Sequence, residues 1–197
     1  MNKYKFFLVL MLTPIVCMSQ YETQEYKLIS SIDEIEIRYY PSSIMAKYID
    51  AENMNRGFNY LFRYISGVND LNKKISMTTP VHMERGEKES SIEFVLPGEF
   101  NYKNVPKPAN SKVKVYETKN TYYAAIFYSG YTNSAKEKVM IKKIKSKLLK
   151  QNIQIIGKEK ILVYNSPYKF FNRRNEIIIP INYNINKLDN QINLLKK

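Results

Sequence analysis

Few residues of this chain are suited to catalysis. Among its 197 residues there is one histidine, His82, and one cysteine, Cys17. A single histidine excludes a metal site built on two histidines, and a Ser-His-Asp triad would have to use His82 as its base. No serine stands in a G-x-S-x-G nucleophile elbow, and no phosphate-binding glycine motif occurs. We therefore expect a binding protein without catalytic residues rather than an enzyme.

His82 nevertheless has a chemistry to consider. It follows Pro80 and Val81 near the end of an expected strand. A neutral imidazole can serve as an axial ligand to haem iron, and so can a tyrosine. The chain has 17 tyrosines, so none of them stands out as a ligand. His82 is a candidate axial ligand, and an ordinary side chain at a strand end is the simpler interpretation.

An expected helix from about residue 53 to 65 offers a surface for a flat ligand. Its apolar residues recur at helical spacing and share one face: Phe58, Leu61, Phe62 and Ile65. Arg56 and Arg63 stand beside that face. Apolar stacking with a guanidinium edge suits a planar ligand that carries carboxylates. The same pattern also fits a helix that packs on the core while its arginines are solvated.

The elements that must position these residues follow one order twice. The first half predicts strands Ile35–Tyr39 and Ile44–Ile49, the helix ended by Gly67, then strands Ile75–Val81 (stopped by Pro80) and Ile92–Leu96. The second half predicts strands Val113–Tyr116 and Tyr122–Tyr128, a helix from about Ala135 to Gln151 with a Ser134/Glu137 capping box, then strands Lys160–Tyr164 and Glu176–Ile181. The fold class expected is α+β, with duplicated β-β-α-β-β units forming a curved antiparallel sheet or open barrel with two flanking helices. We also expect a cleft between helix and sheet.

The two ends of the chain predict export and a short tail. Residues 1–19 place Lys3 and Lys5 before an apolar run and small residues, the order of a signal peptide cleaved between Ser19 and Gln20. Lipidation at Cys17 is the less favoured alternative, because Val16 precedes it where a small residue is usual. If the chain is cleaved after Ser19, the mature chain contains no cysteine and no transmembrane segment. Residues 20–182 form the expected domain, and residues 183–197 a tail with a short helical pattern.

The net charge of +13 favours anionic partners. Seven lysines gather on the second expected helix: Lys136, Lys138, Lys142, Lys143, Lys145, Lys147 and Lys150. An acidic partner or a membrane surface would suit them, and a solubilising face is the commoner explanation. Arg173 and Arg174 precede Glu176 at a strand start, where one arginine can pair with Glu176 or Glu93 while the other reaches an anion. Export argues against nucleic acid.

Six ordered motifs between Tyr26 and Ile181 resemble the SOUL/haem-binding family. They are E-I-R-Y-Y-P from Glu36, G-F with L-F-R-Y-I-S-G-V-N from Gly57, K-I-S-M-T-T-P-V from Lys74, F-Y-S-G from Phe127, Y-N-S-P from Tyr164, and R-R-N-E from Arg173. The resemblance implies a duplicated sheet with two helices and non-covalent binding of haem or another tetrapyrrole. It also implies a ligand against the first helix, at Phe58, Leu61, Phe62 and Arg63. Some relatives carry a histidine in the R-x-Y element, where this chain has Tyr39, which excludes a histidine ligand at that position.

These observations together predict a monomeric, non-enzymatic binder of haem or a related tetrapyrrole. It would act as a carrier, buffer or scavenger outside the cytoplasm, with no nucleic-acid partner. The family also resembles effector-binding domains that hold varied small molecules. The alternative is therefore a small-molecule or protein-interaction module of the same fold without physiological haem binding.

Overall fold

The structure is a computed structural model that describes residues 21–50, 54–86 and 89–183. The expected signal peptide, Cys17 and the tail after Tyr183 lie outside the described residues. The helices and strands of the described residues lie between Glu22 and Asn182.

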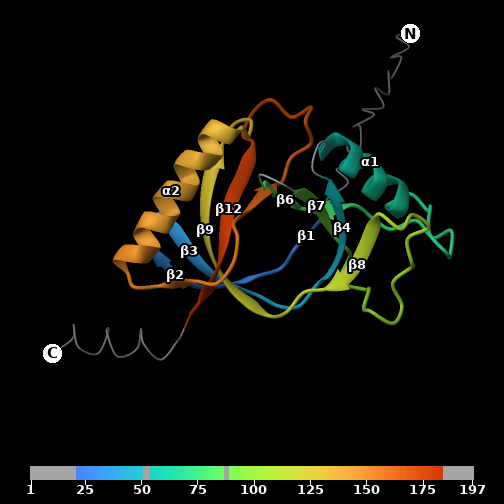
Figure 1. The fold of residues 1–197 in the computed structure, drawn as a ribbon, viewed down its shortest axis with the longest axis horizontal. Coiled ribbons are helices and arrows are strands. Elements are labelled where there is room, and N and C mark those ends of the chain that lie inside the picture. The colour runs from blue at the N-terminus through green and yellow to red at the C-terminus, as the bar shows by residue number, and fades with distance from the viewer. Residues whose placement is uncertain (1–20, 51–53, 87–88, 184–197) are drawn as a thin grey trace, which may run out of the picture.

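A single curved antiparallel sheet forms the body of the molecule (Figure 1). Its strands lie in the order β2 (Lys27–Ile32), β3 (Ile35–Tyr40), β9 (Thr121–Ser129), β12 (Arg174–Asn182), β11 (Lys160–Val163), β6 (Val81–Glu84), β7 (Ser90–Val95), β4 (Ile44–Asp50) and β8 (Val113–Glu117). A tenth strand, β10 (Gln154–Ile155), pairs with β12, and β1 (Glu22–Thr23) pairs in parallel with β5 (Thr78–Thr79). The sheet is not closed, since β2 and β8 end it. The expected α+β class with a curved sheet is confirmed.

The strand order shows the duplication directly. The first unit is β3, β4, helix α1 (Met54–Ile65), β6 and β7, and the second is β8, β9, helix α2 (Ser134–Lys150), β11 and β12. The corresponding strands are β3 and β8, β4 and β9, β6 and β11, and β7 and β12. If each strand is replaced by its counterpart, the sheet order from β3 to β8 reads in reverse, and the β6–β11 pair lies at its centre. The two units are therefore related by a pseudo-twofold axis. Each unit also gives one strand to the other, since β3 pairs with β9 and β8 pairs with β4.

Both helices lie on the outside of the curve, one on each arm of the sheet (Figure 1). α1 buries Leu61 and Tyr64 against Tyr48 and Phe94, and this cluster forms the core of the first unit. α2 buries its own apolar residues Ile144 and Leu148 in the core of the second unit, with Ile177, Ile179 and their neighbours. The expected cleft between helix and sheet is absent at α1, because Leu61, Tyr64 and Ile65 fill that interface with at most 3% of each residue exposed.

Two local predictions are wrong. The strand expected over Ile75–Val81 does not form as one element: β5 covers only Thr78–Thr79 and ends before Pro80, while β6 begins at Val81 and runs on through His82. The cap of α2 is Asn133, whose Oδ1 accepts a hydrogen bond from the Lys136 amide at 2.9 Å, so Ser134 is the first helical residue. Glu137 turns inward and binds Arg85 instead of completing a capping box. The end of α1 is as expected, because Gly67 has φ of +109° and a side chain there would be strained.

Candidate functional site

Two exposed phenylalanines form a stack on one flank of α1. The rings of Phe58 and Phe62 lie 6.1 Å apart between centroids at an interplanar angle of 11°. They are four residues apart and therefore neighbours on the helix surface. Phe58 also meets the buried ring of Phe94 edge-on, at 5.3 Å and 68°. With 37% and 50% of the two residues exposed, a rigidly supported aromatic surface faces outward.

The apolar face that the sequence predicted on α1 is partly buried and partly exposed in the structure. Leu61 is 0% exposed and lies in the core with Tyr64 and Ile65, so it is not available to a ligand. The buried face is centred near Leu61 because Gly57, without a side chain, lets the helix approach Tyr48 closely. Phe58 and Phe62 are left at the edge of this face. Only these two of the three expected apolar contacts remain accessible.

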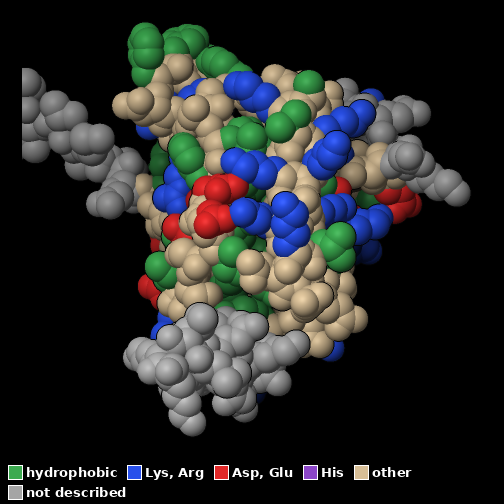
Figure 2. Space-filling view, turned by 90° about the vertical axis from the view of Figure 1, so that its left-hand side faces the viewer, with side chains coloured by type: hydrophobic (Ala, Val, Ile, Leu, Met, Phe, Trp, Pro, Cys, Tyr) green, Lys and Arg blue, Asp and Glu red, His purple; other side chains and the backbone are tan. Residues whose placement is uncertain are grey.

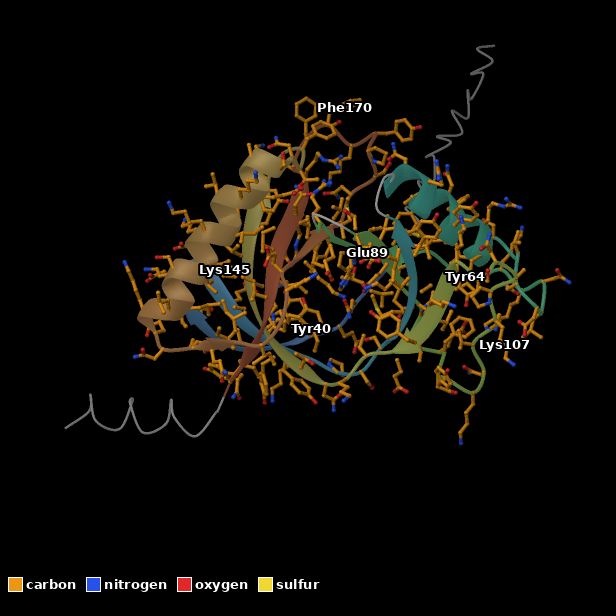
Figure 3. All side chains as sticks on the ribbon, in the orientation of Figure 1. Tyr40, Tyr64, Glu89, Lys107, Lys145 and Phe170 are labelled. Carbon is orange, nitrogen blue, oxygen red and sulfur yellow. The ribbon has the colours of Figure 1, made fainter. Side chains whose placement is uncertain are left out.

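The arginines of α1 lie further round the helix. Arg56 and Arg63 are both exposed. Arg63 follows Phe62 directly and so points about 100° away from it. It lines a hollow of about 210 Å³ with Tyr60, Tyr64 and Val68. The other side is formed by the linker residues Pro108, Ala109 and Asn110 and by Val113 at the start of β8. The Tyr64 hydroxyl donates to the Pro106 carbonyl at 2.7 Å and fixes that linker to the helix (Figure 3 labels Tyr64 and nearby Lys107).

His82 lies on the opposite face of the sheet from the phenylalanine stack. It pairs with Glu93 across β6 and β7, while the next residue, Phe94, faces α1. His82 is 5% exposed; its Nε2 lies 2.8 Å from Gln24 Oε1, and Nδ1 has no hydrogen-bond partner in the described part of the chain. Burial, followed by the nearby Lys160 charge, lowers the pKa of His82 to about 3. His82 and the α1 surface are thus not brought together as one haem site.

The concave face of the sheet, which carries neither helix, holds a polar network that the sequence analysis largely missed. The Arg38 guanidinium donates to both oxygens of Glu176, at 2.6 and 3.1 Å, and both residues are almost fully buried. The Tyr164 hydroxyl and Arg174 also donate to Glu176. Burial raises the pKa of the Glu176 carboxyl, but Arg38 and Arg174 outweigh it and hold that pKa below its ordinary value. Arg38 and Glu176 are 138 residues apart, so no local pattern reveals their contact.

A second ion cluster on the concave face surrounds Glu93. Lys160 and Lys47 reach its two oxygens at 2.7 and 3.0 Å, and the Tyr116 hydroxyl donates to it at 3.0 Å. Burial raises the pKa of Glu93, but the two lysines prevail and lower it to about 2. The cavity beside this cluster measures only about 20 Å³ and is lined by Tyr40, His82, Lys160 and their neighbours. A cavity of that size holds about one water molecule, so it is too small for a tetrapyrrole.

The two arginines before Glu176 have different roles. Arg174 makes the expected pair with Glu176 at 2.6 Å. Arg173 does not reach an external anion: it is 5% exposed and donates to the carbonyls of Ser166 and Lys169, at 2.6 and 2.7 Å. It therefore supports the loop between β11 and β12.

Residues 21–50, 54–86 and 89–183 offer neither a candidate metal site nor a candidate membrane-spanning helix. No group of three or more His, Cys, Asp and Glu side chains there could hold a metal ion. No helix in these ranges is long and apolar enough to cross a membrane.

Comparison with known proteins agrees with the motifs. The family model described as SOUL heme-binding protein matches residues 21–180. The chain belongs to the SOUL family of haem-binding proteins. Human Heme-binding protein 2 is 27% identical over 157 residues, which cover 72% of this chain and 75% of that protein.

Solved structures resemble this SOUL chain in fold alone. The EcmrR C-terminal domain superposes with a TM-score of 0.56 at 11% identity, covering 81% of this chain and 99% of that one. A hydrolase from Listeria innocua gives a TM-score of 0.54 at 10% identity, covering 76% and 92%. At such identities, neither likeness transfers an activity or a ligand to this chain.

Proposed function

We propose that this SOUL protein binds haem or a related tetrapyrrole non-covalently, against the phenylalanine stack of α1. The observation that carries the proposal is the exposed pair Phe58 and Phe62, supported from below by Phe94, in a chain of a haem-binding family. Aromatic rings held in place suit stacking against a flat macrocycle. Arg63 would pair with a propionate at the edge, since a guanidinium and a carboxylate form a charge-assisted hydrogen bond.

Haem bound at the phenylalanine stack would have no histidine ligand to its iron. His82 is buried on the other face of the sheet, so recognition would rest on the macrocycle and its carboxylates. Haemin and metal-free protoporphyrin should therefore bind with similar affinity. A protein that relied on an axial histidine would bind haemin far more tightly than the metal-free ring.

The test is a titration of the purified protein with haemin and with metal-free protoporphyrin, followed at the Soret band. We expect one-to-one saturation with both ligands. Phe62→Ala should weaken both about tenfold, because it removes one stacking partner and its buried area, and Arg63→Ala should weaken both by a smaller factor. Phe127→Ala is the matched control, since Phe127 is 55% exposed on β9, away from α1.

Three outcomes would count against this site. An equal loss of affinity in Phe62→Ala and Phe127→Ala would indicate non-specific adsorption of the ligand. Binding of haemin alone, abolished by His82→Gln, would move the site to the concave face. Binding of neither ligand above the level of an unrelated basic protein would favour the interaction-module alternative.

We further propose a carrier, buffer or scavenger role outside the cytoplasm, without a catalysed reaction. The charge pattern of residues 1–19 supports export, and the net charge of +11 that remains after loss of Lys3 and Lys5 would help to capture a dianionic ligand. Mass spectrometry of the protein from its own cells should find Gln20 as the first residue. A lipid-bearing Cys17 at the N-terminus would instead show an anchored form. In air with a reductant, haem bound to this protein should be degraded no faster than haem bound to an unrelated non-enzymatic haem binder, whereas faster degradation would indicate an enzyme.

A further inference from the structure

The loop between β11 and β12 presents three aromatic side chains to solvent. Tyr168, Phe170 and Phe171 are 83%, 71% and 83% exposed, and we call these three residues the aromatic tip. Figure 3 shows Phe170 at the outer end of the molecule, beyond the first turn of α2. The haem proposal does not use these residues.

The loop below the aromatic tip is firmly held. Buried Arg173 donates to the carbonyls of Ser166, Lys169 and Asn165, and its guanidinium lies 4.3 Å from the centre of the Tyr131 ring. The Tyr131 hydroxyl in turn donates to the Pro167 carbonyl at 3.1 Å, which joins the loop to the start of α2. A buried arginine thus fixes a loop whose aromatic side chains are largely exposed. Such pre-organisation lowers the entropy cost of binding.

Unpaired lysines accompany the aromatic tip. Lys169 lies within it, and Lys138 and Lys142 lie on the outward stripe of α2; none of the three makes an ion pair with a described residue. The lysines on the flanks of α2 differ, because Lys143, Lys145 and Lys147 pair with Glu34, Glu159 and Asp33. Figure 2 shows hydrophobic side chains projecting at the upper end of this face, with Lys and Arg side chains below them.

We infer that the aromatic tip inserts into the surface of an anionic phospholipid bilayer, with Lys169 and the outward lysines of α2 contacting the headgroups. Aromatic residues favour the membrane interface, where an apolar body and a polar rim are both solvated. Anionic lipid complements the net charge of +11 that the chain carries from Gln20 onward, without Lys3 and Lys5. A protein partner fits less well, because three aromatic side chains bury at most about 150–250 Å² each, less in total than the roughly 800 Å² per side of a stable protein interface.

The absence of tryptophan from the chain makes a direct test possible. Phe170→Trp places a single fluorescent reporter in the aromatic tip of the otherwise unchanged exported chain, Gln20 to Lys197. Vesicles of equal parts phosphatidylserine and phosphatidylcholine should shift its emission to the blue, and brominated acyl chains should quench it. Vesicles of phosphatidylcholine alone should have little effect. Tyr102→Trp, at a 66% exposed residue in the β7–β8 linker, is the matched reporter and should not change with either vesicle.

A pair of charge reversals tests whether the lysine beside the aromatic tip contributes to vesicle binding. In the Phe170→Trp chain, Lys169→Glu should raise the lipid concentration for half the shift about fivefold or more, since each cation near an anionic surface contributes about 1 kcal/mol. Lys107→Glu changes net charge equally but lies far from the tip (Figure 3) and should have little effect. An unshifted Phe170→Trp emission, or identical shifts from both tryptophan reporters, would overturn the inference. So would equal effects of the two charge reversals.

Discussion

His82 stays neutral beside several charged side chains, because burial penalises its protonated form more than Glu93 and Glu176 stabilise it. Its folded pKa of about 3 lies below the ordinary value of 6.5. Between about pH 3 and pH 6.5 the unfolded chain therefore binds a proton at His82 that the folded chain does not. Its contribution to stability is complete above pH 6.5 and falls as the pH drops toward 3. Glu93 behaves similarly, but only below about pH 4.5.

The window between pH 7 and pH 5 consequently isolates His82, the one histidine of the chain. We predict that the free energy of unfolding falls by about 2 kcal/mol between these values. Urea denaturation at both pH values measures the fall. His82→Gln keeps a polar side chain but cannot titrate, so its stability should change little over the same range. An equal fall in the variant would assign the effect to other groups.

Single residues also show where sequence reasoning reached its limit. The spacing of Phe58, Leu61 and Phe62 correctly predicted an apolar helix face, but not which side chain would be buried. That depends on Gly57 and on Tyr48, a residue of another element. The concave network was largely invisible for the same reason, because Arg38 and Glu176 lie in different units and 138 residues apart in the chain.

At the scale of elements, α1 packs on the sheet through its glycine. A Cβ on Gly57 would lie 2.6 Å from Ile92 Cγ2 and 2.8 Å from Tyr48 Cδ1. Both neighbours are buried and have little room to move. The contact orients α1 and thereby sets how far the phenylalanine stack stands out from the sheet.

We predict that Gly57→Ala destabilises the protein by roughly 1–3 kcal/mol through overpacking, although alanine gains about 1 kcal/mol in helix propensity. Asn59→Ala, at an exposed position of the same helix, should be neutral or slightly stabilising. Chemical denaturation of both variants measures the difference. A stabilised Gly57→Ala would mean that α1 can move away from the sheet at no cost.

Most elements were predictable because their signals are local. The helical spacing of apolar residues and the capping and turn residues beside them predicted the bounds of both helices to within about one residue. For α1 the observed bounds are Met54–Ile65. The strand expected over Ile75–Val81 and the Ser134 cap were wrong, because Ile75 and Met77 pack on the first core outside any strand, and because either Asn133 or Ser134 can cap a helix. The edge strand β2 has little apolar alternation and was not predicted.

At the scale of the whole molecule, each unit completes the other. β3 of the first unit pairs with β9 of the second, β8 of the second pairs with β4 of the first, and β6 pairs with β11 at the centre. Removing structure from one unit therefore breaks pairing in both. The two apolar cores should melt together although they lie under different helices.

We predict a single cooperative unfolding transition. Leu61→Ala and Ile144→Ala each remove a fully buried side chain, one from each core, and each should cost about 2–5 kcal/mol. Calorimetry should show one peak that moves to lower temperature in both variants, with coincident circular dichroism and tyrosine fluorescence. A shoulder that appears in only one variant would show that the halves unfold independently.

The symmetric strand order also bears on how such a chain could have arisen. One β-β-α-β-β unit alone would have an unpaired central edge and would lack the strand that the other unit contributes. Two identical copies could supply both to each other, with the axis now hidden inside the monomer becoming the axis of a homodimer. Gene duplication and fusion would then join the subunits through the linker between β7 and β8. In that history the two helices begin as equivalent surfaces, and only α1 acquires the paired phenylalanines while α2 acquires the lysines.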